Sequence, residues 1–331
     1  MKIGVLGAGT WGMALARMLS NSNHEVMVYS ALPSEIDELS TTRRQKNLPG
    51  MIIPEEIVFT KDIAEACKDK DIILCAVPSI FVRKTMENAK PYIKKGQIIV
   101  DVAKGIEPGT LFTMSQIIED VLGNQMRVVA LSGPTHAEEV AKDMPTTVVS
   151  ACKDIEAARI VQDVFMNDNM RVYTNEDIIG VEICGALKNV IALASGISTG
   201  LGYGDNARAA LITRGIAEMM RLGKAMNCNI HTFSGLAGIG DLIVTATSVH
   251  SRNNRCGALI GQGKDPEEAI KEVGMVVEGI NALPAAMELK EKYKVQLPII
   301  ETVNDIVNNK ADAKKAVYAL MTREKKDEIE F

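Results

Sequence analysis

Residues 3–12 read Ile-Gly-Val-Leu-Gly-Ala-Gly-Thr-Trp-Gly, an apolar run that passes directly into a glycine-rich turn. The turn has the spacing Gly7-x-Gly9-x-x-Gly12, and a helical pattern follows it. In such a unit the first glycine allows the tight turn, the second lets the backbone approach a pyrophosphate, and the third lets the helix pack close to the strand. The N–H groups that open the helix then face the phosphates. The stretch therefore predicts a dinucleotide site that includes Gly7, Gly9 and Gly12.

Strand and helix patterns alternate through the first half of the chain. The expected strands span residues 2–6, 25–29, 71–75, 97–101, 127–131, 146–150 and 170–173. The expected helices span residues 11–21, 33–41, 61–68, 79–90, 110–121 and 153–165. This alternation predicts an α/β fold, a Rossmann-like, doubly wound parallel sheet with helices on both faces. Such sheets bind ligands at the carboxyl edge of their strands.

Helical periodicity dominates the second half. The expected helices span residues 180–199, 205–227, 252–261, 266–273, 278–293 and 297–309. Glycine-rich turns at 200–204 and 235–240 separate some of them. We therefore expect two domains, a dinucleotide-binding domain over residues 1–178 and a mainly α-helical substrate or catalytic domain over residues 179–331.

Composition excludes several classes of protein. The 331 residues carry a net charge of −5, which argues against binding to nucleic acid. No uninterrupted run of 18 apolar residues is present, and the start of the chain resembles a strand rather than a signal peptide. The six cysteines lie far apart, and the four histidines lack metal-site spacing. We expect a cytoplasmic protein with no metal site, no membrane insertion and no nucleic-acid partner.

Lys188 is the first candidate for acid–base chemistry. A nicotinamide enzyme that reduces a carbonyl group needs a proton donor beside the hydride acceptor. Lys188 interrupts a helix that is otherwise rich in small and apolar residues. A lysine buried there would have a lowered pKa and could act as an acid or a base near neutral pH. The alternative is a lysine whose long side chain reaches the surface.

Two further polar groups admit both a functional and a structural interpretation. Asp241 follows a glycine-rich turn, where it could pair with a lysine or act as the N-cap of a helix over residues 242–246. The cluster Ser251-Arg252-Asn253-Asn254-Arg255 precedes an apolar run. A hydroxyl, a guanidinium and amides at a helix N-terminus suit a phosphate, but a solvated cap has the same pattern.

Three loops lie at the expected ligand-binding edge. Lys104-Gly105 follows one strand, and Gly133-Pro-Thr-His-Ala-Glu138 follows the next and opens a helix; each could equally be a plain connection. The second strand ends in Ser30-Ala31, where NAD-specific sites usually place an acid. The missing acid favours NADP, but no arginine stands there either. Arg43 and Arg44 come later, where they either reach a 2′-phosphate or are solvated. The choice between NADP and NAD therefore stays open.

Taken together, these segments resemble the bacterial-type NAD(P)-dependent glycerol-3-phosphate dehydrogenases. Seven motifs occur in the order of that family and cover nearly the whole chain, at residues 7–16, 103–107, 131–140, 182–192, 235–242, 251–255 and 276–279. Thr10 and Thr135 replace serines that are common in the family, and the hydroxyl is kept. Ser30-Ala31 replaces a basic residue, which weakens any expectation of strict NADPH preference.

The resemblance implies reversible hydride transfer between dihydroxyacetone phosphate and sn-glycerol 3-phosphate, as part of phospholipid synthesis. Lys188 matches the catalytic lysine of the family. Lys188 also counts among the residues that match substrate-binding positions, with Lys104, Gly133, Thr135, Asp241, Ser251, Arg252 and Asn253. The residues that match cofactor-binding positions are Thr10, Trp11, Lys104, Ala137, Arg252, Val276 and Glu278. The expected partner is a small phosphorylated substrate, and the apolar helical half allows a homodimer.

Two other classes compete with this interpretation. A β-hydroxyacid dehydrogenase or ketopantoate reductase relative would share the two domains and a catalytic lysine, but would act on a carboxylate. A non-catalytic nucleotide sensor would keep the glycine turn, but it would not need Lys188 together with Asp241 and residues 251–253.

Overall fold

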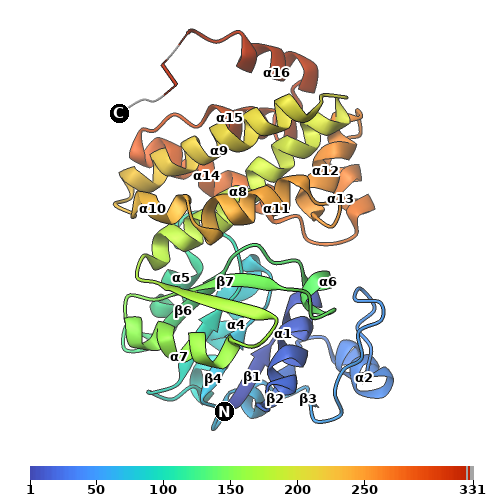
Figure 1. Ribbon diagram of the computed structural model, residues 1–331, viewed down its shortest axis with the longest axis vertical. Coiled ribbons are helices and arrows are strands. Elements are labelled where there is room, and N and C mark those ends of the chain that lie inside the picture. Colours follow the sequence, from blue (N-terminus) through green and yellow to red (C-terminus); the bar gives the residue numbers. More distant parts are fainter. Residues whose placement is uncertain (326, 329–331) are drawn as a thin grey trace.

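The computed structural model describes residues 1–325, 327 and 328. Figure 1 shows a sheet with its flanking helices below a stack of helices formed by the second half of the chain. Within the described residues, eight strands form one sheet in the order β3-β2-β1-β4-β5-β6-β7-β8. The strands are β1 (Lys2–Leu6), β2 (Glu25–Tyr29), β3 (Val58–Thr60), β4 (Ile72–Cys75), β5 (Ile98–Asp101), β6 (Arg127–Ser132), β7 (Thr146–Ala151) and β8 (Met170–Asn175). The predicted α/β class is confirmed, and β3 was missed because three residues show no clear period.

The prediction of a wholly parallel sheet is wrong for β7 and β8. The first six strands are parallel, but β7 pairs antiparallel with β6, with Ala130 opposite Ala151, and β8 runs parallel to β7. The connection from β6 to β7 holds only the short helix α6 (Ala137–Val140), so it does not cross the sheet and the chain re-enters from the same edge. An apolar strand pattern carries no information about direction, which is why the sequence could not show this reversal.

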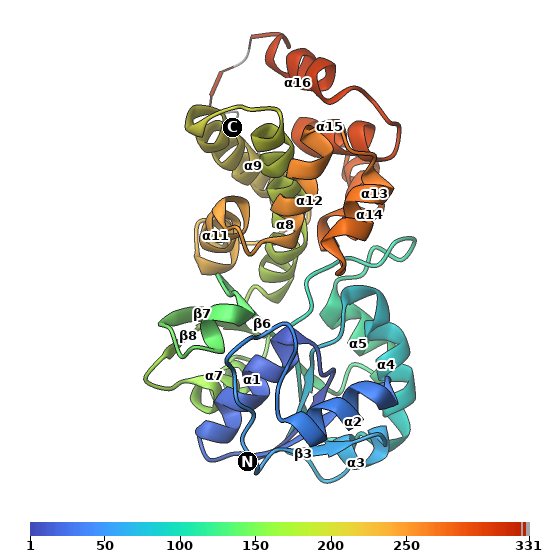
Figure 2. The same ribbon diagram turned by 90° about the vertical axis from the view of Figure 1, so that its right-hand side faces the viewer.

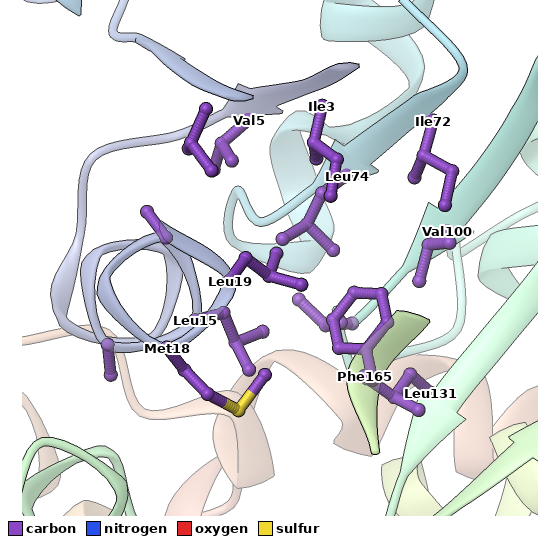
Figure 3. Close-up of a cluster of buried hydrophobic side chains, with 14 of the residues drawn as sticks. Ile3, Val5, Leu15, Met18, Leu19, Ile72, Leu74, Val100, Leu131 and Phe165 are labelled. Atoms are coloured by element: carbon purple, nitrogen blue, oxygen red, sulfur yellow. The ribbon is translucent and has the colours of Figure 1, made fainter. Parts of the chain in front are cut away.

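Helices cover both faces of the sheet (Figure 2). The helices α1 (Thr10–Asn21), α2 (Pro33–Thr42) and α7 (Ile155–Phe165) share one core with the strands, and α3 (Ile63–Cys67), α4 (Val82–Ala89) and α5 (Met114–Leu122) share another. Figure 3 shows the first core, where Leu19 and Phe165 lie against Leu74. The next strand residue, Cys75, belongs to the opposite core, as the two-residue period of a strand requires.

A single apolar helix forms the centre of the second half. This helix, α8 (Ile178–Gly200), has the length and hydropathy of a membrane span, but 94% of its apolar window is buried inside the protein. The helices and short turns around it are α9 (Asp205–Ala225), α10 (Ile230–Phe233), η3 (Leu236–Gly240), α11 (Asp241–Thr247), α12 (Arg252–Gly261), α13 (Pro266–Val273), α14 (Glu278–Tyr293), α15 (Pro298–Val307) and α16 (Ala313–Met321). The sequence patterns did not predict α10 or α16.

The packing of α12 on α8 depends on glycines. A Cβ atom on Gly257 would lie 2.1 Å from the carbonyl oxygen of Leu193, and one on Gly196 would lie 2.1 Å from that of Asn254. The two helices therefore touch through their backbones. This contact holds the N-terminus of α12, with Arg252, close to the middle of α8.

Candidate functional site

A buried carboxylate joins two lysines between the sheet and the helical half. The Oδ1 atom of Asp241 accepts a hydrogen bond from Lys188 Nζ at 2.7 Å, and its Oδ2 atom accepts one from Lys104 Nζ at 2.6 Å. Lys104 Nζ also donates to the carbonyl oxygen of Gly133 at 3.1 Å. The side chains of Lys188 and Asp241 are only 7% and 1% exposed. Four predicted site residues thus meet in one connected network.

Each member of this network comes from a different element. Lys104 lies in the loop after β5, Gly133 follows β6, Lys188 lies in the middle of α8, and Asp241 is the first residue of α11. The carboxylate of Asp241 does not cap α11, whose N-cap is Gly240, so the capping alternative is wrong. The alternative that Lys188 reaches the surface is also wrong, because α8 is enclosed along this part of its length.

The surroundings of Lys188 and Asp241 shift the pKa values of both side chains. Burial lowers the pKa of Lys188 to about 8, against the opposing effect of Asp241, and the charges of Lys104 and Arg252 lower it further. Burial alone would raise the pKa of Asp241, but the charges and hydrogen bonds of Lys104 and Lys188 lower it below its ordinary value. Asp241 therefore stays ionised, while Lys188 can gain or lose a proton near neutral pH.

Two residues next to Lys188 were missed as site residues. Thr245 Oγ1 accepts from Lys188 Nζ at 2.6 Å and donates to the carbonyl oxygen of Asp241 at 2.6 Å. Asn189 Oδ1 accepts from Asn253 Nδ2 at 2.9 Å. The signal for Thr245 was its place one helical turn after Asp241, on the same face of α11. Thr245 orients the ammonium group, and Asn189 links α8 to the start of α12.

The start of α12 brings the predicted phosphate cluster to the same place. Ser251 is the N-cap, and its Oγ accepts from the backbone N–H of Asn254 at 3.2 Å. Asn253 Oδ1 accepts from the backbone N–H of Gly279 at 2.8 Å, so the buried amide also ties α12 to α14. Arg252 and Arg255 carry the positive charges of the cluster, and the first turn of α12 contains no acid. The capping interpretation of Ser251 is correct, and it leaves a positive helix end that suits a phosphate.

The glycine turn has the shape that a dinucleotide needs. Gly7 has a φ of +118°, and a Cβ atom there would lie 2.6 Å from the carbonyl oxygen of Ala76. A Cβ on Gly12 would lie 2.1 Å from the carbonyl oxygen of Gly7, whereas one on Gly9 would meet nothing within 4 Å. Helix α1 then begins at Thr10 and Trp11 with no side-chain cap and no acid in its first turn. Open space above uncapped N–H groups fits a pyrophosphate.

The remaining predicted residues lie around the carboxyl edge of the sheet. Glu278, the first residue of α14, accepts from the backbone N–H and the hydroxyl of Ser79 at 3.2 and 2.6 Å, and Ser79 lies just after β4. Glu278 therefore links the helical half to the carboxyl edge of the sheet. Thr135 Oγ1 donates to the carbonyl oxygen of Gly133 at 3.1 Å. Ala137 is the first residue of α6, and Val276 lies in the loop before α14; neither has a polar side chain that joins the lysine network.

Two family models divide the chain between them. Residues 2–158 match the N-terminal part of NAD-dependent glycerol-3-phosphate dehydrogenase, and residues 177–318 match its C-terminal part. The chain belongs to the NAD-dependent glycerol-3-phosphate dehydrogenase family. This membership confirms the predicted family, the enzyme class of oxidoreductase and the use of a nicotinamide cofactor.

Individual relatives in the glycerol-3-phosphate dehydrogenase family match over their full length. The chain is 69% identical to glycerol-3-phosphate dehydrogenase (NAD(P)+) 2 of Lactobacillus delbrueckii subsp. bulgaricus, with 99% of both chains covered. It is 50% identical to the Bacillus velezensis glycerol-3-phosphate dehydrogenase (NAD(P)+), covering 99% of this chain and 96% of the relative. The crystal structure of glycerol-3-phosphate dehydrogenase from Coxiella burnetii superposes with a TM-score of 0.94 at 35% identity, covering 97% of this chain and 99% of that one.

Proposed function

We propose that this chain catalyses the reversible reduction of dihydroxyacetone phosphate to sn-glycerol 3-phosphate, with Lys188 as the general acid. The observation that carries the proposal is the buried Lys188 ammonium, which Asp241 Oδ1 and Thr245 Oγ1 orient at 2.7 and 2.6 Å. Its pKa of about 8 lets it donate a proton in one direction and accept one in the other. A bound nicotinamide cofactor supplies the hydride for carbon 2 of the ketone.

The other members of the network support the proton transfer. Lys188 holds its proton toward the carbonyl oxygen, where negative charge develops during reduction. Lys104, joined to Asp241, adds a second positive charge at the same place. Asp241 keeps both ammonium groups in position and offsets one of their two positive charges, since a buried cation without a partner is strongly unfavourable. Thr135 and Gly133 complete the wall of the site beside Lys104.

The phosphate of the substrate is assigned to the start of α12. Arg252 would form charge-assisted hydrogen bonds to it, and the N-terminal end of the helix favours a negative group. The contacts of Asn253 with Asn189 and Gly279 hold this end beside Lys188. A ketone that carries a phosphate therefore reaches both groups at once, which fixes its orientation.

The cofactor is assigned to the glycine turn and its surroundings. Gly7, Gly9 and Gly12, with Thr10 and Trp11, would hold the pyrophosphate end. Lys104, Ala137, Arg252, Val276 and Glu278 would contact the nicotinamide half, because they surround the edge between the sheet and the helices. The division into a dinucleotide-binding domain over residues 1–178 and a helical domain over residues 179–331 is supported by large hydrophobic cores that lie almost entirely within one half each. A small cluster that includes Ala130 and Val181 joins the two halves.

The biological setting belongs to the same proposal. We place the enzyme in the cytoplasm, where it supplies glycerol phosphate for phospholipid synthesis. A homodimer is supported by apolar side chains left in solvent on α16, where Tyr318 is 71% exposed and Met321 78% exposed. Sedimentation of the purified chain at several concentrations tests the dimer, and a monomer throughout contradicts it.

A spectrophotometric assay tests the activity directly. The wild-type chain should oxidise a reduced nicotinamide cofactor when dihydroxyacetone phosphate is added, and a keto acid such as ketopantoate should give no comparable rate. The Lys188→Ala variant should lose this activity while it still binds cofactor. Turnover of the keto acid alone would favour the hydroxyacid dehydrogenase class, and binding without any turnover would favour a sensor.

A further inference from the structure

The adenosine end of the cofactor site contains an acid that the sequence pattern did not reveal. Helix α2 begins at Pro33, and Glu35 lies in its first turn. The Glu35 carboxylate accepts a hydrogen bond from Ser30 Oγ at 2.6 Å, and Ser30 is the first residue after β2. A carboxylate thus lies at the end of the second strand although the residue in that position is a serine.

This carboxylate lies beside the glycine turn. The backbone N–H of Gly7 donates to the carbonyl oxygen of Tyr29 at 2.8 Å, and Tyr29 immediately precedes Ser30. Gln45 contacts the same turn, because its Nε2 donates to the carbonyl oxygen of Ala8 at 3.5 Å. In Rossmann-type sites the ribose 2′-hydroxyl of NAD, or the 2′-phosphate of NADP, binds next to the end of this strand.

Of the two arginines near this strand end, Arg43 is engaged elsewhere, whereas the Arg44 side chain is exposed to solvent. Arg43 Nη1 donates to the carbonyl oxygens of Ile57 and Pro54 at 2.8 and 3.3 Å, and its guanidinium stacks on Phe59 at 5.2 Å from the ring centroid. The backbone N–H of Leu32 donates to Ser30 Oγ at 3.1 Å, and Pro33 has no N–H group. The start of α2 therefore places the negative Glu35 beside Ser30.

We propose that this enzyme prefers NAD(H) over NADP(H), and that Glu35, oriented by Ser30, is the residue that determines the preference. The carboxylate accepts hydrogen bonds from the ribose hydroxyls, as the acid at the end of the strand does in NAD-specific sites. A 2′-phosphate in its place brings two like charges close together, which weakens binding by about tenfold to about a hundredfold. This inference rests on nicotinamide binding at the glycine turn.

Trp11 provides a direct test of binding that does not depend on turnover. It is the only tryptophan in the chain, and it lies in the first turn of α1. Energy transfer from Trp11 to the reduced nicotinamide should therefore report the dissociation constants of NADH and NADPH separately. The wild-type chain should bind NADH at least about tenfold more tightly. Equal affinities, or a preference for NADPH, would overturn the proposal; no binding of either would instead contradict the assigned cofactor site.

Matched variants isolate the role of Glu35. Glu35→Gln should weaken NADH binding and strengthen NADPH binding, whereas a general loss of folding would weaken both. Ser30→Arg combined with Glu35→Gln should reverse the preference. Glu38→Gln removes the same charge from an exposed position of α2 and should change neither constant. The proposal fails if Glu38→Gln has the same effect as Glu35→Gln, or if Arg44→Ala selectively weakens NADPH binding, since Arg44 would then be the group that holds the 2′-phosphate.

Discussion

Lys188 and Asp241 lie 53 positions apart in the chain, yet the Lys188 Nζ donates to the Asp241 carboxylate at 2.7 Å, and both side chains are buried. The contact joins the middle of α8 to the first residue of α11. It keeps an ammonium group buried without requiring it to lose its proton. This pairing is the basis of the first three predictions below.

The rate in each direction should depend on pH through Lys188. Reduction of the ketone needs protonated Lys188, so its turnover should be constant at low pH and fall as the pH rises through about 8. Oxidation of glycerol phosphate needs neutral Lys188, so its turnover should rise through the same pH. Both profiles should be measured as kcat/KM, which reports the ionisation of the free enzyme, and profiles that change in the same direction would contradict the assignment.

Replacing Lys188 should separate chemistry from binding. Lys188→Ala removes the proton donor and should lower turnover by about a hundredfold to about ten-thousandfold, with little change in the dissociation constant of the cofactor. Lys188→Arg keeps the charge but cannot release a proton near neutral pH, so it should be similarly inactive. Near-normal turnover in either variant would exclude Lys188 as the acid.

Removing the carboxylate should destabilise the protein as well as the site. Asp241→Asn leaves the buried Lys188 and the half-buried Lys104 without a counter-charge and should reduce the free energy of unfolding by about 3–5 kcal/mol. Urea unfolding measures this loss. The double variant Asp241→Asn with Lys104→Met removes one of the two cations and should recover part of the stability. An unchanged free energy of unfolding in the single variant would show that the network contributes nothing to the fold.

Arg252 should matter only for phosphorylated substrates. Arg252→Ala should raise the KM for dihydroxyacetone phosphate by about tenfold to about a hundredfold, since a charge-assisted hydrogen bond is lost. The Arg252→Ala variant should reduce unphosphorylated dihydroxyacetone as slowly as the wild type does. Arg255→Ala is a suitable control, because Arg255 is exposed on the same helix. Equal effects of the two substitutions would place the phosphate elsewhere.

Alanine substitutions at Gly9 and Gly12 should have different effects on stability and cofactor affinity. A Cβ on Gly12 would collide with the Gly7 carbonyl oxygen, so Gly12→Ala should lower the melting temperature. A Cβ on Gly9 meets no protein atom within 4 Å, so Gly9→Ala should keep its stability and lose cofactor affinity. Thermal unfolding and Trp11 fluorescence measure the two effects. A stable Gly9→Ala variant with normal affinity would mean that the pyrophosphate does not approach Gly9.

The sequence by itself determined the fold class and the family. The glycine spacing, the alternation of apolar strands with helices and the seven ordered motifs are all local patterns, and the periods of 2 and 3.6 residues reveal them without knowledge of contacts. The same patterns placed Lys188 on an apolar helix and Arg252 at a helix start. They were insufficient for the direction of β7 and β8, because strand periodicity is identical in both directions.

Only the tertiary structure decided the state of the polar residues. Whether Lys188 is buried or exposed depends on what packs around α8, and whether Asp241 caps a helix or binds lysines depends on where the loop after β5 lies. Thr245 is also part of the site only because the fold brings α11 against Lys188. The acid near the end of β2 is the clearest case: Ser30 stands in the strand-end position, and folding of α2 brings the Glu35 carboxylate to within 2.6 Å of its hydroxyl. The spacing of residues along the chain shows which of them are neighbours on one helix or strand. The charge state and pKa of a buried side chain depend instead on residues that other elements bring next to it.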